Sequence, residues 1–162
     1  VMGTRSGDLD PAILFHLRRT AGMTVDELDT LLNRKSGLLG LSGRSDMRDI
    51  LRGLDESDAA ATLAFDVYIR RLRVYAGAYV ALLGGVDVIS FTAGVGENVP
   101  LVRARALETL GFLGLRVDSE RNEAPGRGIR RISTADSAVE VLVVPTNEEL
   151  EIARQTVAVT AP

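Results

Sequence analysis

Apolar residues recur at intervals of three and four along most of the chain, a spacing that predicts amphipathic helices. Polar residues mark where these helices begin. Asp10 directly precedes Pro11, and Thr24 stands three positions before Glu27, as in a capping box. The predicted helices cover residues 11–21, 25–34, 46–54, 58–83, 100–110 and 147–157.

Three shorter stretches, residues 86–92, 128–133 and 139–144, carry apolar runs that favour β-strands. Residues 38–45 and 111–128 contain glycine and charged residues and are predicted to be loops. Helices and strands together predict an α/β domain. A long apolar helix needs a sheet face or a helical partner, and few strands are visible, so we expect part of a sheet to lie outside this sequence.

The longest predicted helix, residues 58–83, carries one apolar stripe that we expect to face a core. At ~1.5 Å per residue it would be about 40 Å long. Charged residues, among them Asp66 and Arg70, interrupt it and argue against a membrane span. Its tyrosines, Tyr68, Tyr75 and Tyr79, are interpreted as core or subunit-interface residues.

Residues 86–100, VDVISFTAGVGENVP, read as a buried strand, a glycine turn and a helix start. Gly94 and Gly96 would allow positive φ angles and a close approach of the backbone. Ligands of open α/β sheets bind beyond the carboxyl ends of the strands, where free N–H groups converge. A phosphate-bearing ligand is therefore the first candidate. The segment is neither a Walker A loop nor a complete G-x-G-x-x-G motif.

Composition narrows the function classes. The absence of cysteine excludes disulfides, thiolate metal sites and cysteine nucleophiles. A net charge of −3 predicts no nucleic-acid partner. Residues 1–10 lack the apolar run of a signal peptide, and the sequence starts as if inside a domain, so we expect a fragment of a longer protein. His16, the only histidine, is interpreted as a packing or surface residue.

Four segments, in order, resemble the C-terminal part of the acetate kinase family: GTRSGDLDP, SGLLGLSG with SDMRDI, FTAGVGEN and PTNEELEIA. The resemblance covers essentially residues 1–162, and it implies the C-terminal nucleotide-binding lobe of an actin-like (ribonuclease H-like) ATPase fold without its first strands. It also implies reversible transfer of phosphate from ATP to acetate, giving acetyl phosphate and ADP, with Mg²⁺, in a cytoplasmic homodimer. The family's N-terminal lobe and its first phosphate loop have no counterpart here, so we expect the fragment alone to be inactive.

The resemblance also implies site residues, each with a simpler alternative. Arg5 would stabilise the transferring phosphoryl group, or else pair with Asp8 or Asp10. Glu148 would bind magnesium, or else complement a helix dipole beside a cap at Asn147. The segment that would contact adenosine comprises Asp46, Met47 and Arg48, of which Asp46 is also a plain N-cap candidate. The nucleotide segment comprises Gly94, Val95, Gly96, Glu97 and Asn98.

Three other readings stay open. A related propionate or butyrate kinase fits the same motifs, since the acyl pocket of the family lies mostly in the N-terminal lobe. A non-catalytic nucleotide-binding or dimerisation module would explain a chain with few strands and a long apolar helix. An unrelated phosphate-binding α/β domain is the third. Unpaired sheet edges and uncovered apolar surface predict self-association, most simply as a dimer.

Overall fold

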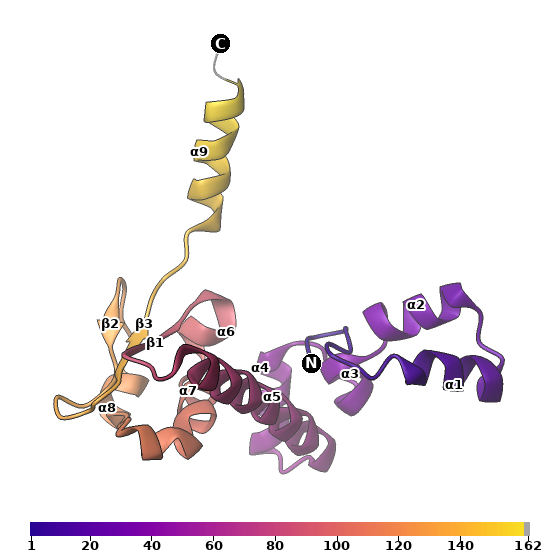
Figure 1. Cartoon of the computed structure of the whole chain (residues 1–162), viewed down its shortest axis with the longest axis horizontal. Helices are drawn as coiled ribbons and strands as arrows, with labels where there is room; N and C mark the ends of the chain where they lie inside the picture. Colours follow the sequence, from indigo (N-terminus) through magenta and orange to yellow (C-terminus); the bar gives the residue numbers. More distant parts are fainter. Residues whose placement is uncertain (161–162) are drawn as a thin grey trace. The chain divides into compact units, whose positions relative to one another are not determined.

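The computed structural model describes residues 1–160 and combines many helices with one small sheet (Figure 1). The chain forms two compact units, residues 1–78 and 79–162, and the boundary falls inside helix α5 (Ala59–Leu83). We call them the first and the second unit. The α/β class predicted from the sequence is confirmed.

The first unit is helical. It contains α1 (Ala12–Ala21), α2 (Val25–Arg34), α3 (Gly37–Ser42), α4 (Met47–Asp55) and the first part of α5. The predicted start signals are confirmed. Thr24 and Glu27 form the capping box of α2, and the Asp10 carboxylate accepts a hydrogen bond from the Ala12 N–H at 2.8 Å. The buried apolar residues of this unit are Leu28, Leu38, Met47, Ile50, Ala61, Ala64, Phe65 and Ile69.

The predicted loop at residues 38–45 is wrong, because most of it is helix α3. Its glycines suit the two ends of a short helix. Gly37, with φ of +64°, starts it, and Gly43, with φ of +73°, ends it in the left-handed conformation. Leu38 is 3% exposed, so burial of this leucine helps to hold a helix whose sequence looks like a loop.

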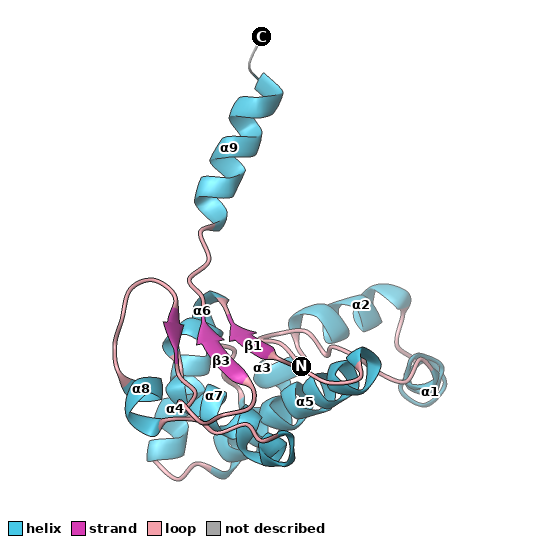
Figure 2. Cartoon of the chain, turned by 60° about the vertical axis from the view of Figure 1, so that its left-hand side comes forward, coloured by secondary structure: helices cyan, strands magenta, loops and turns pink. Residues whose placement is uncertain are grey.

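The second unit is built on a sheet of three strands, β1 (Val88–Phe91), β2 (Arg130–Arg131) and β3 (Glu140–Val143). Figure 2 shows β3 in the middle, parallel to β1 and antiparallel to β2. Val88 pairs with Glu140 and Phe91 with Val143. The helical elements of this unit are the end of α5, α6 (Ala93–Asn98), α7 (Pro100–Leu107), the 3-10 helix η1 (Glu108–Leu113), α8 (Ser119–Glu123) and α9 (Glu148–Thr160).

Strand β1 is not buried as predicted. It lies at the edge of the sheet, and Val88 is 47% exposed. Apolar residues favour a strand at an edge as well as in the middle of a sheet, so the run indicated a strand without fixing its burial. The buried strand is the central β3, where Val141 and Val143 are nearly inaccessible.

The predicted apolar stripe of α5 is only partly buried. Phe65 and Ile69 are in the core, whereas Tyr75, Tyr79 and Leu83 are exposed. The tyrosines are therefore not uniformly core residues. Beyond Arg73 apolar residues lie all around the helix, and spacing alone does not single out a buried face there.

Other boundaries shift. The predicted strands at 128–133 and 139–144 shorten to β2 and β3, and the predicted loop at 111–128 contains the end of η1 and all of α8. The Asp118 carboxylate starts α8 by accepting from the Arg121 N–H, a cap that the sequence did not reveal among so many charged residues. The last helix continues to Thr160, and all its residues are exposed.

Candidate functional site

The segment that carries Arg5 is held by backbone hydrogen bonds to the helices that follow it. The Ser6 N–H donates to the Leu32 carbonyl, the Ser36 N–H to the Thr4 carbonyl and the Leu38 N–H to the Met2 carbonyl, each at 2.9 Å. Gly37 is needed here, since a Cβ on it would lie 2.2 Å from the Met2 carbonyl oxygen and 2.7 Å from that of Arg5. The segment is thus fixed closely against the start of α3.

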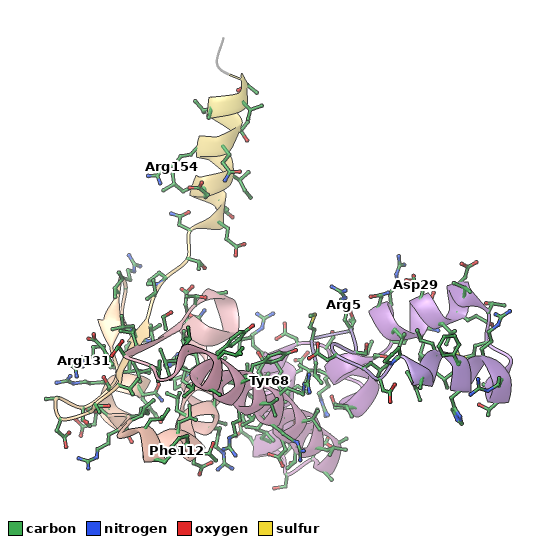
Figure 3. The ribbon with its side chains drawn as sticks, in the orientation of Figure 1. Arg5, Asp29, Tyr68, Phe112, Arg131 and Arg154 are labelled. Carbon is green, nitrogen blue, oxygen red and sulfur yellow. The ribbon has the colours of Figure 1, made fainter. Side chains whose placement is uncertain are left out.

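Arg5 is exposed, and one of its nitrogens is oriented by α2. Its Nε donates to Asn33 Oδ1 at 3.2 Å, and Asn33 Nδ2 donates to Asp29 Oδ1 at 2.8 Å. Arg5 and Asp29 are labelled in Figure 3. No hydrogen bond or ion pair within residues 1–160 uses the Nη atoms of Arg5. The guanidinium therefore offers its two terminal nitrogens to solvent, at a pocket of about 500 Å³.

The alternative pairings predicted for Arg5 do not form. Asp8 instead accepts hydrogen bonds from Arg71 and Tyr75 on α5, and Asp10 caps α1. The Tyr75 hydroxyl, and after it the Arg71 charge, hold the pKa of Asp8 below its ordinary value. Asp8 and Asp10 therefore both accept hydrogen bonds from other groups. Among the residues described, Arg5 has no carboxylate partner.

Asp46 and Arg48 form a surface pair at the start of α4. Asp46 Oδ1 accepts from the Arg48 N–H at 2.8 Å, and Asp46 Oδ2 lies 2.6 Å from Arg48 Nη2. The hydrogen bonds from the Arg48 side chain and N–H lower the pKa of Asp46 to about 2. Asp46 is thus the predicted N-cap and also an ion-pair partner. Met47 is buried, so Asp46 and Arg48 are the accessible side chains of the three.

The GVGEN segment forms α6 rather than a loop, and neither Gly94 nor Gly96 adopts the positive φ that glycine allows. Positive φ occurs one residue earlier, at Ala93, with 60°. Ala93 is the first residue of α6, so the turn between β1 and α6 puts an alanine in a left-handed conformation that is costly for a residue with a Cβ. A Cβ on Gly94 would meet no atom within 4 Å, whereas one on Gly96 would lie 3.4 Å from Phe91.

The polar side chains of α6 bond within the protein. Asn98 Nδ2 donates to the Gly94 carbonyl at 2.9 Å. Glu97 Oε1 accepts from the Thr146 N–H at 2.9 Å and from the Thr146 hydroxyl at 3.0 Å. The Thr146 N–H is the main cause that lowers the pKa of Glu97 below its ordinary value. Glu97 therefore links α6 to the segment that leads into α9.

This link brings two predicted motifs to one pocket, which we call the Gly94–Glu148 pocket. It has a volume of about 350 Å³ and is lined by Ala93, Gly94, Thr146, Asn147, Glu148 and Glu149. The two sides are contributed by residues that follow the parallel strands β1 and β3. The pocket lies beyond the carboxyl ends of these strands, where the sequence predicted a ligand site.

Glu148 begins α9, and Asn147 Oδ1 caps the helix by accepting from the Leu150 N–H at 3.0 Å. The predicted helix-start arrangement is thus present, and the exposed Glu148 carboxylate also lines the pocket. Within residues 1–160, no group of three or more His, Cys, Asp and Glu side chains is arranged to hold a metal ion. Mg²⁺ is commonly bound by only one or two carboxylates together with water and substrate phosphates. A single carboxylate such as that of Glu148 fits a site of this kind.

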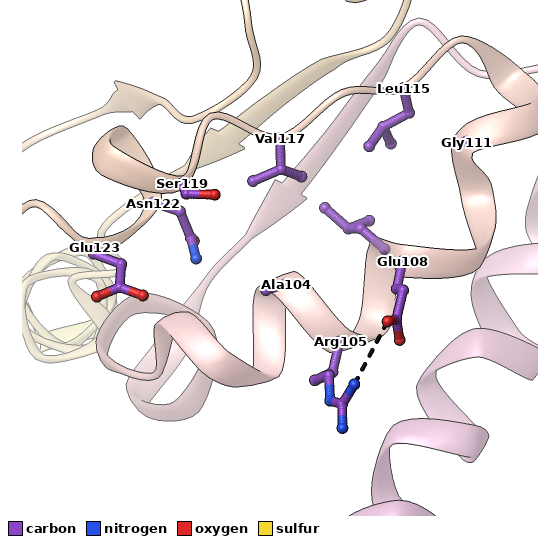
Figure 4. Close-up of a pocket in the computed structure, with 10 residues that line it drawn as sticks. Ala104, Arg105, Glu108, Gly111, Leu115, Val117, Ser119, Asn122 and Glu123 are labelled. Carbon is purple, nitrogen blue, oxygen red and sulfur yellow. Dashed lines mark hydrogen bonds and ion pairs between the residues drawn. The ribbon is translucent and has the colours of Figure 1, made fainter.

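Sequence reasoning missed Arg103 and Asn122, which form a buried hydrogen-bonded pair beneath α6. The helix over residues 100–110 was predicted from the spacing of Leu101, Ala104, Leu107 and Leu110. Leu107 and Leu110 are buried, whereas Leu101 is exposed. Val102, Arg103 and Ala106 are also buried, and the spacing did not indicate them. A charged residue among apolar neighbours was the available signal. Asn122 also lines a second pocket of about 350 Å³ beside α7, where Arg105 and Glu108 pair at 3.5 Å (Figure 4).

The remaining candidates add no site. His16 is exposed on α1, as the surface reading predicted. In the described part of the chain, no helix has the length and apolar character needed to cross a membrane. Arg5 and Asp46 belong to the first unit, and the Gly94–Glu148 pocket belongs to the second.

The chain is similar to known acetate kinases. The model of the acetokinase family matches residues 1–154. An acetate kinase of Leifsonia xyli is 63% identical over 96% of this chain and 39% of its own length. The crystal structure of Porphyromonas gingivalis acetate kinase matches with a TM-score of 0.89 and 44% identity, over 97% of this chain and 40% of that chain.

A propionate kinase structure from Francisella tularensis is also similar, with a TM-score of 0.87 and 34% identity, over 96% of this chain and 39% of that chain. The chain thus spans about 40% of the length of the proteins it matches. The family match covers nearly all of the present sequence, including every predicted site residue. The chain therefore belongs to the acetokinase family.

Proposed function

We propose that the full-length protein containing this chain transfers phosphate reversibly between ATP and acetate, giving acetyl phosphate and ADP. The observation that carries the proposal is the Gly94–Glu148 pocket, where two segments about 50 residues apart in sequence meet beyond parallel strands. Membership of the acetokinase family and similarity to proteins named acetate kinase support this reaction.

In this proposal the second unit contributes to holding the nucleotide. Residues 94–98 contact it, and the open space at Gly94 lets it approach the backbone of α6. Glu148 would hold Mg²⁺, and the ion would offset phosphate charge. In the first unit, Asp46 and Arg48 contact adenosine. The Asp46 carboxylate can accept from ribose hydroxyls, and the exposed Arg48 guanidinium can stack on a base.

The chemical step is an in-line attack of an acetate oxygen on the γ-phosphorus, with ADP as the leaving group. Charge then spreads over the equatorial oxygens of the transferring group. The Nη atoms of Arg5, which have no partner within residues 1–160, can donate to these oxygens. Asn33 orients the guanidinium through Nε, so this donor is partly preorganised. The protein contributes positioning and charge stabilisation, and no covalent nucleophile is required.

The decisive experiment measures acetyl phosphate formation by the full-length protein with ATP, Mg²⁺ and acetate. We expect turnover that requires all three, and an Arg5→Ala variant should lose about 10³-fold or more in kcat. Arg18→Ala, an exposed arginine on α1, is the matched control and should keep wild-type kcat. A well-folded full-length protein that forms no acetyl phosphate would refute the proposal.

Acyl-chain preference is tested in the same assay with propionate and butyrate. The similarity to a propionate kinase structure gives this alternative its support. We propose acetate as the preferred acceptor because the relatives with 58–63% identity are named acetate kinase. A higher kcat/KM with propionate or butyrate would assign the protein to that related activity.

A second candidate function concerns the 162-residue chain alone, as a nucleotide-binding or dimerisation module without turnover. It is favoured because the chain spans only about 40% of its relatives yet contains the whole Gly94–Glu148 pocket. Calorimetric titration with ADP and Mg²⁺ tests it. Binding without turnover would support the module, and no binding would leave the chain a structural part only.

We further propose that the full-length protein is a cytoplasmic homodimer, as the family resemblance implies. Exposed apolar side chains on α9, among them Ile152 and Val159, support an association that covers them. Fractionation of the source cells, with acetyl phosphate-forming activity as the marker, tests the compartment. Activity that sediments with membranes or appears in the medium would contradict it.

A further inference from the structure

Arg103, in α7, is the largest fully buried side chain in the described part of the protein. Its Nε donates to Asn122 Oδ1 at 2.8 Å and its Nη2 donates to the Asn122 carbonyl at 2.6 Å. Its Nη1 donates to the Gly96 and Glu97 carbonyls, both at 2.9 Å. All four acceptors are neutral oxygens, which replace the water that the guanidinium has lost.

Burying an arginine costs free energy, because its charged guanidinium loses contact with water. Burial, and after it the charge of Arg130, lowers the pKa of Arg103 to about 10, which leaves the guanidinium charged at neutral pH. An apolar side chain of similar volume would fill the same space without desolvating a charge. The presence of arginine is therefore best explained by the groups that its nitrogens hold.

Two of these groups are carbonyls near the end of α6. A helix as short as Ala93–Asn98 has few internal hydrogen bonds, and its last carbonyls lack partners within the helix. Arg103 satisfies two of them with one nitrogen. The guanidinium is itself anchored on Asn122, whose Nδ2 donates to the Pro100 carbonyl at 3.0 Å. This network ties the C-terminal end of α6 to α7 and α8.

The other end of α6 lines the Gly94–Glu148 pocket through Ala93 and Gly94. The side chain of Glu97 accepts two hydrogen bonds from Thr146, which also lines the pocket. Helix α6 is therefore held at two places, by Arg103 at its carbonyls and by Thr146 at the Glu97 carboxylate. Movement of α6 would change the separation of Gly94 and Glu148 across the pocket.

We propose that Arg103 is a positioning residue for nucleotide binding, because through the Gly96 and Glu97 carbonyls it fixes α6 at one side of the Gly94–Glu148 pocket. This inference rests on the proposed function, in which ATP or ADP occupies the pocket. Arg103 is fully buried and contacts no ligand in this arrangement. Its effect on nucleotide affinity passes through the backbone of α6.

The test uses Arg103→Met in the full-length protein, with Arg105→Met as the matched control. Arg105 is exposed on the same helix, and its guanidinium pairs with Glu108 of η1, whereas that of Arg103 donates to carbonyls of α6. We expect Arg103→Met to raise the Kd for Mg·ADP and the KM for ATP by about tenfold or more, with the KM for acetate unchanged. Arg105→Met should match the wild type in all three.

Two further variants separate positioning from simple loss of folding. Arg103→Lys keeps the charge but cannot reach four oxygens at once, so it should restore only part of the affinity for Mg·ADP. Thr146→Val, at an exposed position, removes the hydroxyl that donates to Glu97 and should weaken Mg·ADP binding with little change in melting temperature. If the variants instead had lower melting temperatures and a raised KM for both ATP and acetate, Arg103 would have a general structural role, and the inference would be overturned.

Hydrogen–deuterium exchange of the ligand-free protein gives a readout that needs no nucleotide. Amides of residues 93–99 should exchange about tenfold faster in Arg103→Met than in Arg105→Met, while amides of β3 keep their protection. Unchanged exchange in residues 93–99 would overturn the inference even if the pocket binds another ligand. The wild type could bind no nucleotide while the two variants still differ in exchange. That outcome would refute the proposed function and the role of Arg103 in nucleotide binding, and only the anchoring of α6 would stand.

Discussion

At the scale of single residues, the Asp46–Arg48 pair has a titration that can be tested directly. The Arg48 side chain and N–H both donate to Asp46, and its pKa falls from 3.8 to about 2. Replacing Arg48 with Gln removes the charge and keeps the N–H donor. We expect the pKa of Asp46 to rise but to stay below 3.8, as measured by NMR titration of its carboxyl carbon.

The sign of the pH effect follows from a lowered pKa. The folded state favours the ionised carboxylate, so the contribution of Asp46 to stability is present above pH 3.8 and is lost as the pH falls towards 2. Arg52→Gln, which breaks the neighbouring pair with Asp49 on the same helix, should leave the Asp46 titration unchanged. An unshifted pKa in Arg48→Gln would contradict the pairing.

The residue scale also shows where sequence reasoning fails. A pattern of apolar positions treats every arginine as a surface residue, so it gave no reason to expect Arg103 in the core. The carbonyls that Arg103 satisfies belong to the preceding helix and become visible only when the chain is folded. Capping residues are different. Thr24 and Asn147 act on their own helices within a few positions, and both were predicted.

At the scale of elements, Gly37 and Gly43 at the two ends of α3 give a matched pair of glycines. Both have positive φ angles, of +64° and +73°, but only Gly37 has backbone atoms where a Cβ would lie. Gly43→Ala should cost about 1 kcal/mol of unfolding free energy for the left-handed conformation. Gly37→Ala should cost at least about 1 kcal/mol more, because the Met2 and Arg5 carbonyls must move. Denaturant unfolding of both variants measures the difference.

The same variants connect this element to the proposed chemistry. Displacement of the Met2–Arg5 segment would move the Arg5 guanidinium, so Gly37→Ala should lower kcat of the full-length protein while Gly43→Ala keeps it. Equal costs for the two variants would show that the close approach at Gly37 relaxes freely.

Secondary structure was predictable where local signals agree, and not where packing decides. The start and end of α5 follow from Asp58 and Gly84, which act locally. Helix α3 was missed because its glycine-rich sequence favours a loop, and burial of Leu38 outweighs that preference. The positive φ at Ala93 was not predicted, because alanine rarely adopts the left-handed conformation.

At the scale of the whole molecule, the candidate site was predicted in part. The order of strands places residues after β1 and β3 at one pocket, and both motifs were predicted from residue type and family resemblance. The hydrogen bonds between Glu97 and Thr146 could not be predicted, because they depend on the register of β1 against β3. The register in turn depends on the order of the strands in the sheet, which cannot be read from local sequence signals.

The free edge of the sheet carries the prediction of self-association. In the described part of the chain, β1 pairs only with β3, and its outer edge leaves backbone groups without a strand partner. Such edges pair readily with a second chain. We therefore expect the 162-residue chain to sediment as a dimer at micromolar concentration.

Val88→Lys, which places a charge on the 47% exposed first residue of β1, should shift the chain towards monomer. Val25→Lys makes the same change at an exposed helix position and should not. A monomeric wild-type chain would refute the association, and an equal response of the two variants would place the contact away from β1.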